Sequence, residues 1–361
     1  MTLYLDANAT EPLRPEARAA AIVAMELPGN PSSVHAEGRA ARRVLEEARA
    51  RVAARFGSVA RDVVFTSGGT EANALAIASL RQGRRVLVGA TEHPAVMRAA
   101  EGAEILPVLP NGRLDLAALE AALAGGPAAL VCLMVANNET GVIHPISEAA
   151  GLCLRHGAAL HLDAVQAAGR IPLDFAASGA ETMAISGHKL GGPKGAGALF
   201  LRPGLDLAPL IAGGGQERGR RGGTEALPAI AGLGAAAEAA DPAEAVRLAL
   251  IRDTIEAGLG LPVAGADAPR LPHTSSIILP GAPAETQVIA LDLAGMRVSA
   301  GSACSSGKVA RSPVLAAMGL GEAAGEAIRV SLPWNTPADA AERFIAAHAA
   351  MRERLALRRA G

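Results

Sequence analysis

The chain has 361 residues, which is enough for about two or three domains. Half of the residues are hydrophobic and 19% are charged, which excludes a disordered chain. Lys and Arg number 34 and Asp and Glu number 35, so the net charge is −1. That balance excludes an overall positive field that would draw the protein to nucleic acid or to an anionic membrane.

The sequence shows neither a secretion signal nor a membrane-spanning run. The opening stretch MTLYLDANATEP lacks a basic region followed by an apolar core. No apolar run approaches the roughly 18 residues of a spanning helix. The three cysteines, Cys132, Cys153 and Cys304, share no metal-ligand spacing. We therefore expect a cytoplasmic protein without a metal site.

After a short strand and a turn in residues 1–15, short apolar strands alternate with helices. We expect helices at 35–56, 72–80 and 146–156. We expect strands at 62–65, 85–89, 130–136, 160–163, 182–185 and 198–201. This alternation predicts an α/β domain with a mainly parallel central sheet.

Polar side chains follow several of these strands, and ligands bind parallel sheets beyond the carboxyl ends of the strands. The residues at those ends are Thr70, His93, Asn138, Asp163 and Lys189. The turn Ser67-Gly68-Gly69-Thr70 precedes a helix and would present free N–H groups to a phosphate. It would serve equally well as an ordinary strand–helix connection.

Asp163 and Lys189 are 26 residues apart, which leaves room for one strand–connection–strand unit that brings both to neighbouring strand ends. A lysine can form a Schiff base with a carbonyl, and a carboxylate can keep a pyridine nitrogen protonated. Taken alone, the aspartate would also serve as a cap and the lysine as a solvated charge. Ser186-x-x-Lys189 also fits a serine acyl-enzyme, although its companion motifs S-D-N and K-T-G are missing.

The second half of the chain changes pattern. A Gly/Arg-rich loop at 213–224 and a helix at 227–240 precede a smaller α+β region. Its expected strands are 274–279, 297–299 and 328–332, and its expected helices are 286–293 and 338–358. Cys304 lies among Gly, Ser and Ala, a setting that favours a reactive thiol. Cys132 and Cys153 fit core positions.

Several motifs in order extend over nearly the whole chain: DANATEPL, GNPSSVHAEGR, FTSGGTEANALAI, TEHPAV, NNETGVI, HLDAVQAAGRIPLD, SGHKLGGPKG, GGGQERGRRGGT, SAGSACSSGK and RVSL. Together they resemble the cysteine desulfurases, which belong to the class V aminotransferase branch of fold-type I pyridoxal-phosphate enzymes. The resemblance implies a large cofactor domain at 14–244. It also implies a small domain, made of 1–13 with 245–361, that carries the cysteine loop.

The resemblance also implies roles for single residues. Lys189 would form the Schiff base with pyridoxal 5'-phosphate, Asp163 would pair with the pyridine nitrogen, and His93 would stack on the ring. Asn138 and Gln166 would bond the region of the ring hydroxyl. Gly69, Thr70, Ser186 and His188 would hold the phosphate, and Thr224 would reach the phosphate of a second subunit. Arg329, with Asn138, would bind the substrate, and Cys304 would be the nucleophile.

The implied partners are L-cysteine as substrate, a second copy in a homodimer with shared active sites, and a sulfur-acceptor or scaffold protein. The implied product serves iron–sulfur cluster assembly or nitrogenase maturation. Two positions depart from the family pattern, Glu11 where a Thr is usual and Gly222 where a Ser is commoner. Alternative activities are a selenocysteine lyase, another class V lyase or aminotransferase, and a non-catalytic sulfur-assembly subunit.

Overall fold

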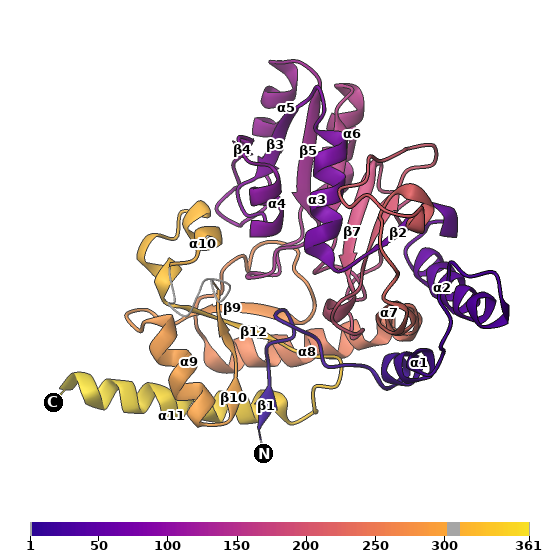
Figure 1. Ribbon diagram of the computed structural model, residues 1–361. Coiled ribbons are helices and arrows are strands. Elements are labelled where there is room, and N and C mark those ends of the chain that lie inside the picture. The colour runs from indigo at the N-terminus through magenta and orange to yellow at the C-terminus, as the bar shows by residue number, and fades with distance from the viewer. Residues whose placement is uncertain (1, 302–310, 361) are drawn as a thin grey trace.

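The computed structural model describes residues 2–301 and 311–360 (Figure 1). A seven-stranded sheet runs through its larger part in the order β2-β8-β7-β6-β5-β3-β4. The strands are β2 (Val63–Thr66), β3 (Arg85–Gly89), β4 (Glu104–Leu106), β5 (Ala129–Met134), β6 (Ala159–Asp163), β7 (Thr182–Ser186) and β8 (Gly197–Leu201). Only β8 runs antiparallel to its neighbours in this sheet. The predicted α/β class with a mainly parallel sheet is therefore confirmed.

Alternate residues of the strands enter two different cores, because side chains of a strand point to opposite faces. Val86 and Val88 of β3 pack with helices α3 (Gly69–Leu80) and α4 (Pro94–Ala99). Leu87, between them, belongs to the larger core under α5 (Leu116–Ala124) and α6 (Ile146–Arg155). The sheet is therefore covered by helices on both faces, as a mostly parallel sheet requires.

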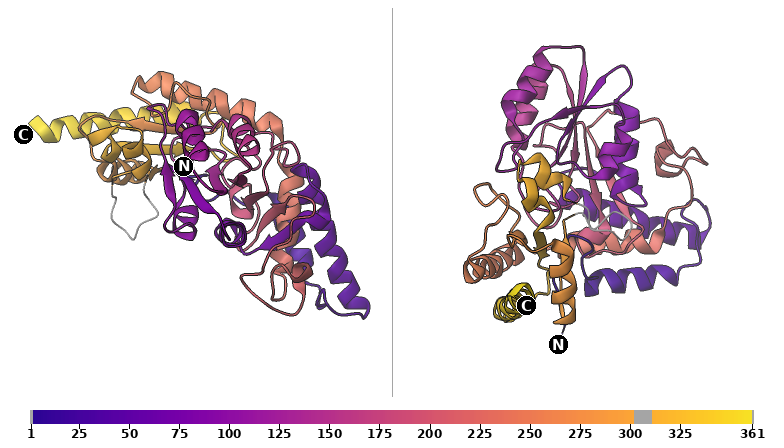
Figure 2. Two further views of the ribbon diagram at one scale, coloured as in Figure 1. Left: turned by 90° about the horizontal axis from the view of Figure 1, so that it is seen from above. Right: turned by 90° about the vertical axis from the view of Figure 1, so that its left-hand side faces the viewer.

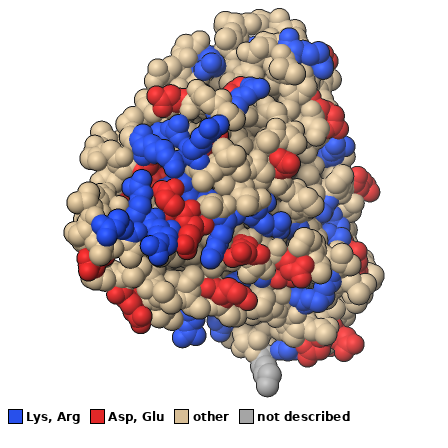
Figure 3. Space-filling model, turned by 90° about the vertical axis from the view of Figure 1, so that its right-hand side faces the viewer, with Lys and Arg blue, Asp and Glu red and all other residues tan. Residues whose placement is uncertain are grey.

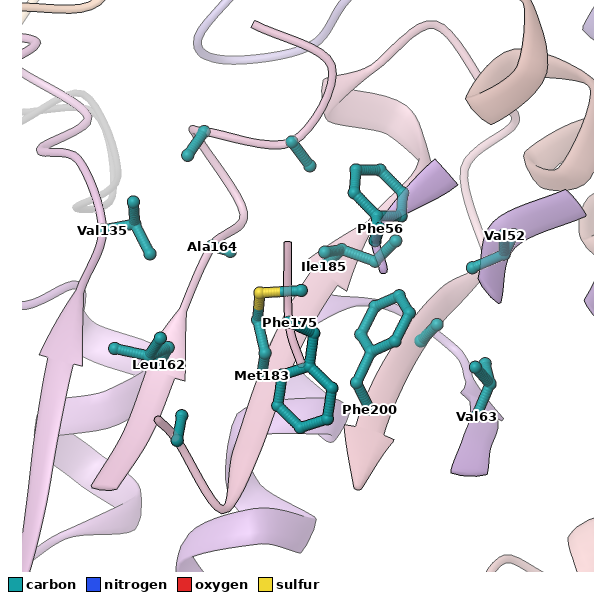
Figure 4. Close-up of a cluster of buried hydrophobic side chains, with 14 of the residues drawn as sticks. Val52, Phe56, Val63, Val135, Leu162, Ala164, Phe175, Met183, Ile185 and Phe200 are labelled. Carbon is teal, nitrogen blue, oxygen red and sulfur yellow. The ribbon is translucent and has the colours of Figure 1, made fainter. Parts of the chain in front are cut away.

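Four phenylalanines belong to the larger core, although aromatic residues make up only 2% of the chain, and three of them pack together (Figure 4). The rings of Phe56 and Phe200 meet edge to face at 5.7 Å between centroids, and Phe175 lies 5.8 Å from Phe200. Aliphatic side chains and alanines fill the rest of this core. Cys132 and Cys153 are buried free cysteines in the cores on either side of the sheet, as expected.

Three helices at the edge of the sheet pack closely: α1 (Pro15–Met25), α2 (Ala36–Arg55) and α7 (Leu227–Ala239). A Cβ on Gly234 of α7 would lie 2.8 Å from the Cα of Ala48 in α2. Only small residues allow two helix backbones to approach this closely, which explains part of the alanine and glycine content.

Figure 3 shows acidic and basic side chains interspersed on the right-hand face of Figure 1. Among such pairs, Glu46 of α2 pairs with Arg42 and with Arg218 of the 213–224 loop.

The C-terminal part has its own core. The antiparallel sheet β11-β12-β9 joins β11 (Ser299–Ala300), β12 (Ala327–Ser331) and β9 (Thr274–Ile278), and β1 (Leu3–Tyr4) pairs with β10 (Met296–Arg297). The helices are α8 (Pro242–Leu259), α9 (Ala284–Leu293), α10 (Pro313–Ala317) and α11 (Ala340–Ala360). Leu3 and Leu5 from the chain start are buried in this core. Two views show this part beside the larger one, with α11 on the outside (Figure 2).

The structure differs from the sequence expectations mainly at helices. Helices α1, α5 and α8 were not predicted, because runs rich in alanine carry little contrast between an apolar and a polar face. Helix α3 begins at Gly69 and not at residue 72, so the predicted turn is its first turn. The expected strand at 297–299 is two short strands separated at Val298. No helix in the part of the chain that the structure describes is long and apolar enough to cross a membrane.

His348 of α11 makes a test of this packing, because it is fully buried beside Phe344 and both ring nitrogens lack a partner. Burial lowers the pKa of His348 to about 4. Unfolding raises that pKa to about 6.5, so below pH 6.5 the unfolded chain binds a proton that the folded protein excludes. Relative to His348→Leu, the wild type should lose about 1.4 kcal/mol of unfolding free energy per pH unit between pH 6.5 and 4.

Urea unfolding of both proteins at several pH values measures this difference. The exposed His156, replaced by Leu, is the matched control. A constant difference between wild type and His348→Leu across this pH range would contradict the prediction.

Candidate active site

One cavity of about 280 Å³ lies at the carboxyl ends of the parallel strands. Most of the predicted site residues line it: Gly69, Thr70, His93, Asn138, Asp163, Gln166, Ser186, His188 and Lys189. Ala9, Asn73 and Met134 are further lining residues. Thr224 and Arg329 are not among those lining residues, and Cys304 lies outside the described residues.

Asp163 ends β6 and is buried, with both carboxylate oxygens hydrogen-bonded. Its Oδ1 accepts from the backbone N–H of Val165 at 2.9 Å, and its Oδ2 accepts from the amide of Asn73 at 2.8 Å. Burial raises the pKa of Asp163, and these two hydrogen bonds and the charge of Lys189 oppose that rise.

A chain of hydrogen bonds fixes the orientation of Asn73. Its amide donates to Asp163, so its Oδ1 accepts from Nε2 of His161 at 2.8 Å. Nδ1 of His161 then accepts from the Thr182 hydroxyl at 2.8 Å. Burial lowers the pKa of His161 to about 3, so the ring is neutral and carries one proton, as this arrangement requires.

Lys189 ends a short 3-10 turn, Gly187–Lys189, that follows β7 directly. Its Nζ donates to the carbonyl of Ala9 at 2.9 Å and to the carbonyl of Asn8. The Gln166 amide also donates to the Asn8 carbonyl, at 3.1 Å. The N-terminal segment 8–11 therefore contacts the amine of Lys189 through its backbone carbonyls. Asp163 ends β6 and Lys189 lies three residues beyond the end of β7, the adjacent parallel strand, so both lie at neighbouring strand ends as their spacing predicted.

Asn8 is a residue that the sequence reasoning missed. Its side chain donates to the carbonyl of Asn138 and to the hydroxyl of Thr274, each at 3.0 Å. Its Oδ1 accepts from Nε2 of His273 at 2.8 Å. Asn8 and Asn73 both occur within the motifs DANATEPL and FTSGGTEANALAI, so the motifs held the signal. Their hydrogen-bond partners are far away in the sequence, so only the fold shows which groups these two side chains bind.

The other side of the cavity combines a flat ring with a helix N-terminus. His93 caps α4, where its Nδ1 accepts from the backbone N–H of Ala95 at 3.1 Å. Burial lowers the pKa of His93, so the ring is neutral. A Cβ on Gly69, the first residue of α3, would lie 2.6 Å from a methyl of Val165. A side chain at that position would force Val165 to move, and glycine leaves the free N–H groups of the helix start accessible to an anion.

Arg329 of β12 is buried beside the cavity wall and holds two other groups. It pairs with Asp6 at 2.7 Å and donates to the carbonyl of Asn138 at 3.1 Å, while its Nε has no partner. Thr224 is exposed and borders a separate small cavity of about 100 Å³ with Arg221 and Thr66. Within residues 2–301 and 311–360, no group of His, Cys, Asp or Glu is arranged to hold a metal ion.

Three comparisons with known proteins agree with this geometry. The aminotransferase class-V family model matches residues 3–344. The chain is 44% identical over 358 residues to a cysteine desulfurase of Cereibacter sphaeroides, covering 93% of this chain and 92% of that protein. It is 38% identical to an IscS-like cysteine desulfurase of Mycobacterium tuberculosis, covering 99% of each. A NifS-like protein of Rickettsia africae has the same fold, with a TM-score of 0.91, 34% identity and coverage of 98% and 100%.

Glu11, where the chain departs from the family pattern, forms a buried ion pair that supports the lysine turn. Its carboxylate pairs with Arg170 and accepts from the backbone N–H of Trp334 at 2.6 Å, and its side chain is fully buried. Its own N–H donates to the carbonyl of His188 at 2.8 Å. Burial raises the pKa of Glu11, and the charge of Arg170 opposes that rise.

Glu11→Ala should therefore lower the free energy of unfolding by about 3 kcal/mol, because it leaves the charge of Arg170 buried without a partner. Replacing both members, with Glu11→Leu and Arg170→Met, should recover most of that loss. Chemical denaturation measures both values. Asp292→Ala breaks the exposed pair with Arg297 and should change stability by about 0.5 kcal/mol or less. A loss below about 1 kcal/mol for Glu11→Ala would show that the pair adds little.

Proposed function

We infer the reaction of this chain from its family, because the chain belongs to the class-V aminotransferases and within them to the cysteine desulfurases. Proteins of this family depend on pyridoxal phosphate and use L-cysteine as substrate, and the chain is a desulfurase of this kind. The geometry of the cavity supports a role for each of its residues in this reaction, and these roles are our proposal.

The cavity fits pyridoxal phosphate in three respects. The start of α3, with Gly69 and Thr70, offers free N–H groups for a phosphate, and Ser186 and His188 lie beside it. The carboxylate of Asp163 lines the cavity and is held by two donors, so it suits a ring nitrogen. The amine of Lys189 enters the same space and suits the aldehyde. We propose these residues, with His93 against the ring face and Asn138 and Gln166 at the ring hydroxyl, as the cofactor site.

When bound, the cofactor withdraws electrons from the Cα of an amino acid and so makes its Cα–H bond acidic. In our proposal Asp163 keeps its negative charge and holds the proton on the ring nitrogen. Lys189, once its amine is free, takes the proton from Cα. The backbone carbonyls of Asn8 and Ala9, which accept from this amine in the structure, would orient it once it is free. Arg329 binds the substrate carboxylate, using the side chain that now bridges Asp6 and Asn138.

Cys304 is the proposed acceptor of the sulfur. Its thiolate attacks the sulfur of the substrate, so that an S–S bond forms and the C–S bond breaks, with the electron pair of that bond left on the substrate carbon. Protonation of the remaining carbon skeleton gives L-alanine, and Cys304 carries a persulfide. Sulfur is neither gained nor lost in this exchange, and no external oxidant is needed.

We propose a homodimer with shared active sites. Thr224 is exposed and does not line the cavity of its own chain, which supports a role toward a second copy. Ile22, Val23 and Met25 of α1 are exposed apolar side chains close to one another, as expected for a contact surface.

We also propose residues 14–244 as the large domain and residues 1–13 with 245–361 as the small one, supported by their separate cores.

The further partners follow from the product. A persulfide must be passed on, so we propose a sulfur-acceptor or scaffold protein in iron–sulfur cluster assembly or a related sulfur transfer. Relatives named IscS-like and NifS-like support this proposal. The scarcity of cysteines supports a reducing, cytoplasmic setting.

Asn73 tests the proposed role of Asp163. Asn73→Leu removes the donor to Oδ2 and should raise the pKa of Asp163, so the ring nitrogen is held less well. The Kd for pyridoxal phosphate should rise at least about tenfold, because a hydrogen bond to a buried charge is lost. Equilibrium dialysis or the visible absorption of the bound cofactor measures this. Asn73→Asp, which introduces a second carboxylate at the same site, should be worse than Asn73→Leu, and unchanged affinity in both would contradict the role.

The direct test of the function is alanine release from L-cysteine by cofactor-loaded protein in the presence of a thiol reductant. Cys304→Ser should lower this release at least about a hundredfold and leave the cofactor bound, because a serine hydroxyl cannot accept the sulfur. The matched control is Cys153→Ala, which removes a buried thiol of the core.

Several outcomes of this test would contradict the proposal. Full activity of Cys304→Ser would remove that residue from the reaction. Much faster release from selenocysteine than from cysteine would favour a selenocysteine lyase. A colourless protein that binds no cofactor would favour a non-catalytic assembly subunit, and labelling of Ser186 by a covalent serine probe would favour an acyl-enzyme.

A further inference from the structure

Gly301, just before the Cys304 segment, and Ser312, shortly after it, contact the same carboxylate. Gly301 directly follows β11, and Ser312 directly precedes α10. The Ser312 hydroxyl donates to Oε2 of Glu139 at 2.5 Å. A Cβ placed on Gly301 would lie only 2.2 Å from that same oxygen. Glycine at 301 is therefore what allows the carboxylate to meet both residues.

Glu139 is held firmly on the larger part of the molecule. It is 5% exposed and lies in the turn that follows β5. Its backbone N–H and that of Thr140 both donate to Oδ1 of Asn137 at 2.9 Å. The Asn137 amide in turn donates to the carbonyl of Thr91 at 3.1 Å. A buried side chain on a turn with this many hydrogen bonds has little freedom to move.

The same turn forms a wall of the cofactor cavity. Asn138, the neighbour of Glu139, lines the cavity, and its carbonyl accepts from Arg329 and Asn8. Burial raises the pKa of Glu139, while the Ser312 hydroxyl and the charge of Arg329 oppose that rise. The contact to Gly301 and Ser312 therefore joins the C-terminal part directly to residues around the reaction centre.

We propose that Glu139 is a positioning residue for Cys304. It holds the chain at a point three residues before the cysteine and at another eight residues after it, both against the cavity wall. The proposal rests on the role of Cys304 proposed above. It has a physical consequence for the rate, because the attack of one sulfur on another requires close placement, and a displacement of about 1 Å can cost about a hundredfold.

Four variants separate the two contacts. Glu139→Ala removes the carboxylate and leaves the Ser312 side chain free to cap α10 through the Leu315 N–H. Glu139→Gln keeps an oxygen that can accept from Ser312. Gly301→Ala places a methyl group against the carboxylate without removing a polar group. The double variant Gly301→Ala/Glu139→Ala removes that clash.

Two rates are compared in the cofactor-loaded protein after L-cysteine is added. One is the substrate-induced change in the visible absorption of the cofactor, and the other is persulfide formation on Cys304, followed by mass spectrometry in a single turnover. In Glu139→Ala and Gly301→Ala, persulfide formation should slow at least about tenfold, while the absorption change stays within about twofold. Glu139→Gln should remain within about threefold, and the double variant should be no slower than Glu139→Ala.

Glu181→Ala is the matched control, because this glutamate also accepts a charged hydrogen bond, at 2.7 Å from Arg202, but precedes the opposite end of β7. It should leave both rates unchanged. A persulfide rate in Glu139→Ala within twofold of the wild type would overturn the proposal. Equal slowing of both steps would also overturn it, because that result indicates a general structural role.

A second readout does not depend on sulfur transfer. Alkylation of Cys304 by iodoacetamide, measured by peptide mass spectrometry without substrate, should be at least about threefold faster in Glu139→Ala and Gly301→Ala than in the wild type, because one constraint on the segment is lost. If the wild type forms no persulfide, the proposed role of Cys304 fails, and this alkylation rate decides by itself whether Glu139 restrains the chain around that cysteine. Equal alkylation rates would then contradict it.

Discussion

A buried carboxylate, Asp163, is the feature on which the rest of the site depends. A carboxylate can remain charged away from water only when donors satisfy it, and here the Val165 N–H and the Asn73 amide do so. The orientation of Asn73 depends in turn on His161 and Thr182, which belong to β6 and β7. The sheet therefore positions the negative charge through a row of neutral groups, none of which needs to change its protonation state.

A second buried carboxyl group, Glu92, lies near Asp163, so the environment of each group decides which of the two is ionised. Oε1 of Glu92 accepts from the Met134 N–H at 2.5 Å, and its Oε2 has no partner. Burial, and then the charge of Asp163, raise the pKa of Glu92 well above its usual range. Two neighbouring buried carboxylates do not both ionise readily. The one with more donors, Asp163, keeps the charge, and Glu92 keeps the proton.

The sequence was sufficient for those parts of the site that depend on local pattern. The apolar runs that end in Asp163 and Ser186 predicted adjacent strand ends, and the Gly-Gly-Thr turn predicted an exposed helix start, because both follow from neighbouring residues. The contacts of Asn8 and Glu139 could not be predicted in this way. Their partners include Thr274 and Ser312, far along the chain, and only the packing of the two parts brings them together.

The helices α1 and α8 were missed for a related reason. In α1 the apolar and polar residues give little contrast, and the helix is recognisable by its packing against α7 more than by its sequence. Conversely, α2 was predicted almost to its ends, because Leu45, Ala48 and Val52 form a regular apolar stripe among charged residues. Prediction from sequence therefore succeeds where one face of an element is exposed, and it weakens where both faces are apolar or alanine-rich.

The N-terminal segment explains why the two parts of the molecule act together. Leu3 and Leu5 are buried in the C-terminal core, yet a few residues later Asn8 and Ala9 cover Lys189 with their carbonyls. The N–H of Asn8 also donates to the hydroxyl of Ser331, which belongs to β12 of the C-terminal part, at 3.0 Å. A shift of the C-terminal part would therefore move the groups that hold the lysine amine. Because Glu139 joins the same two parts on the other side of Asn138, the proposed roles of Lys189 and Cys304 both depend on the relative position of the two cores.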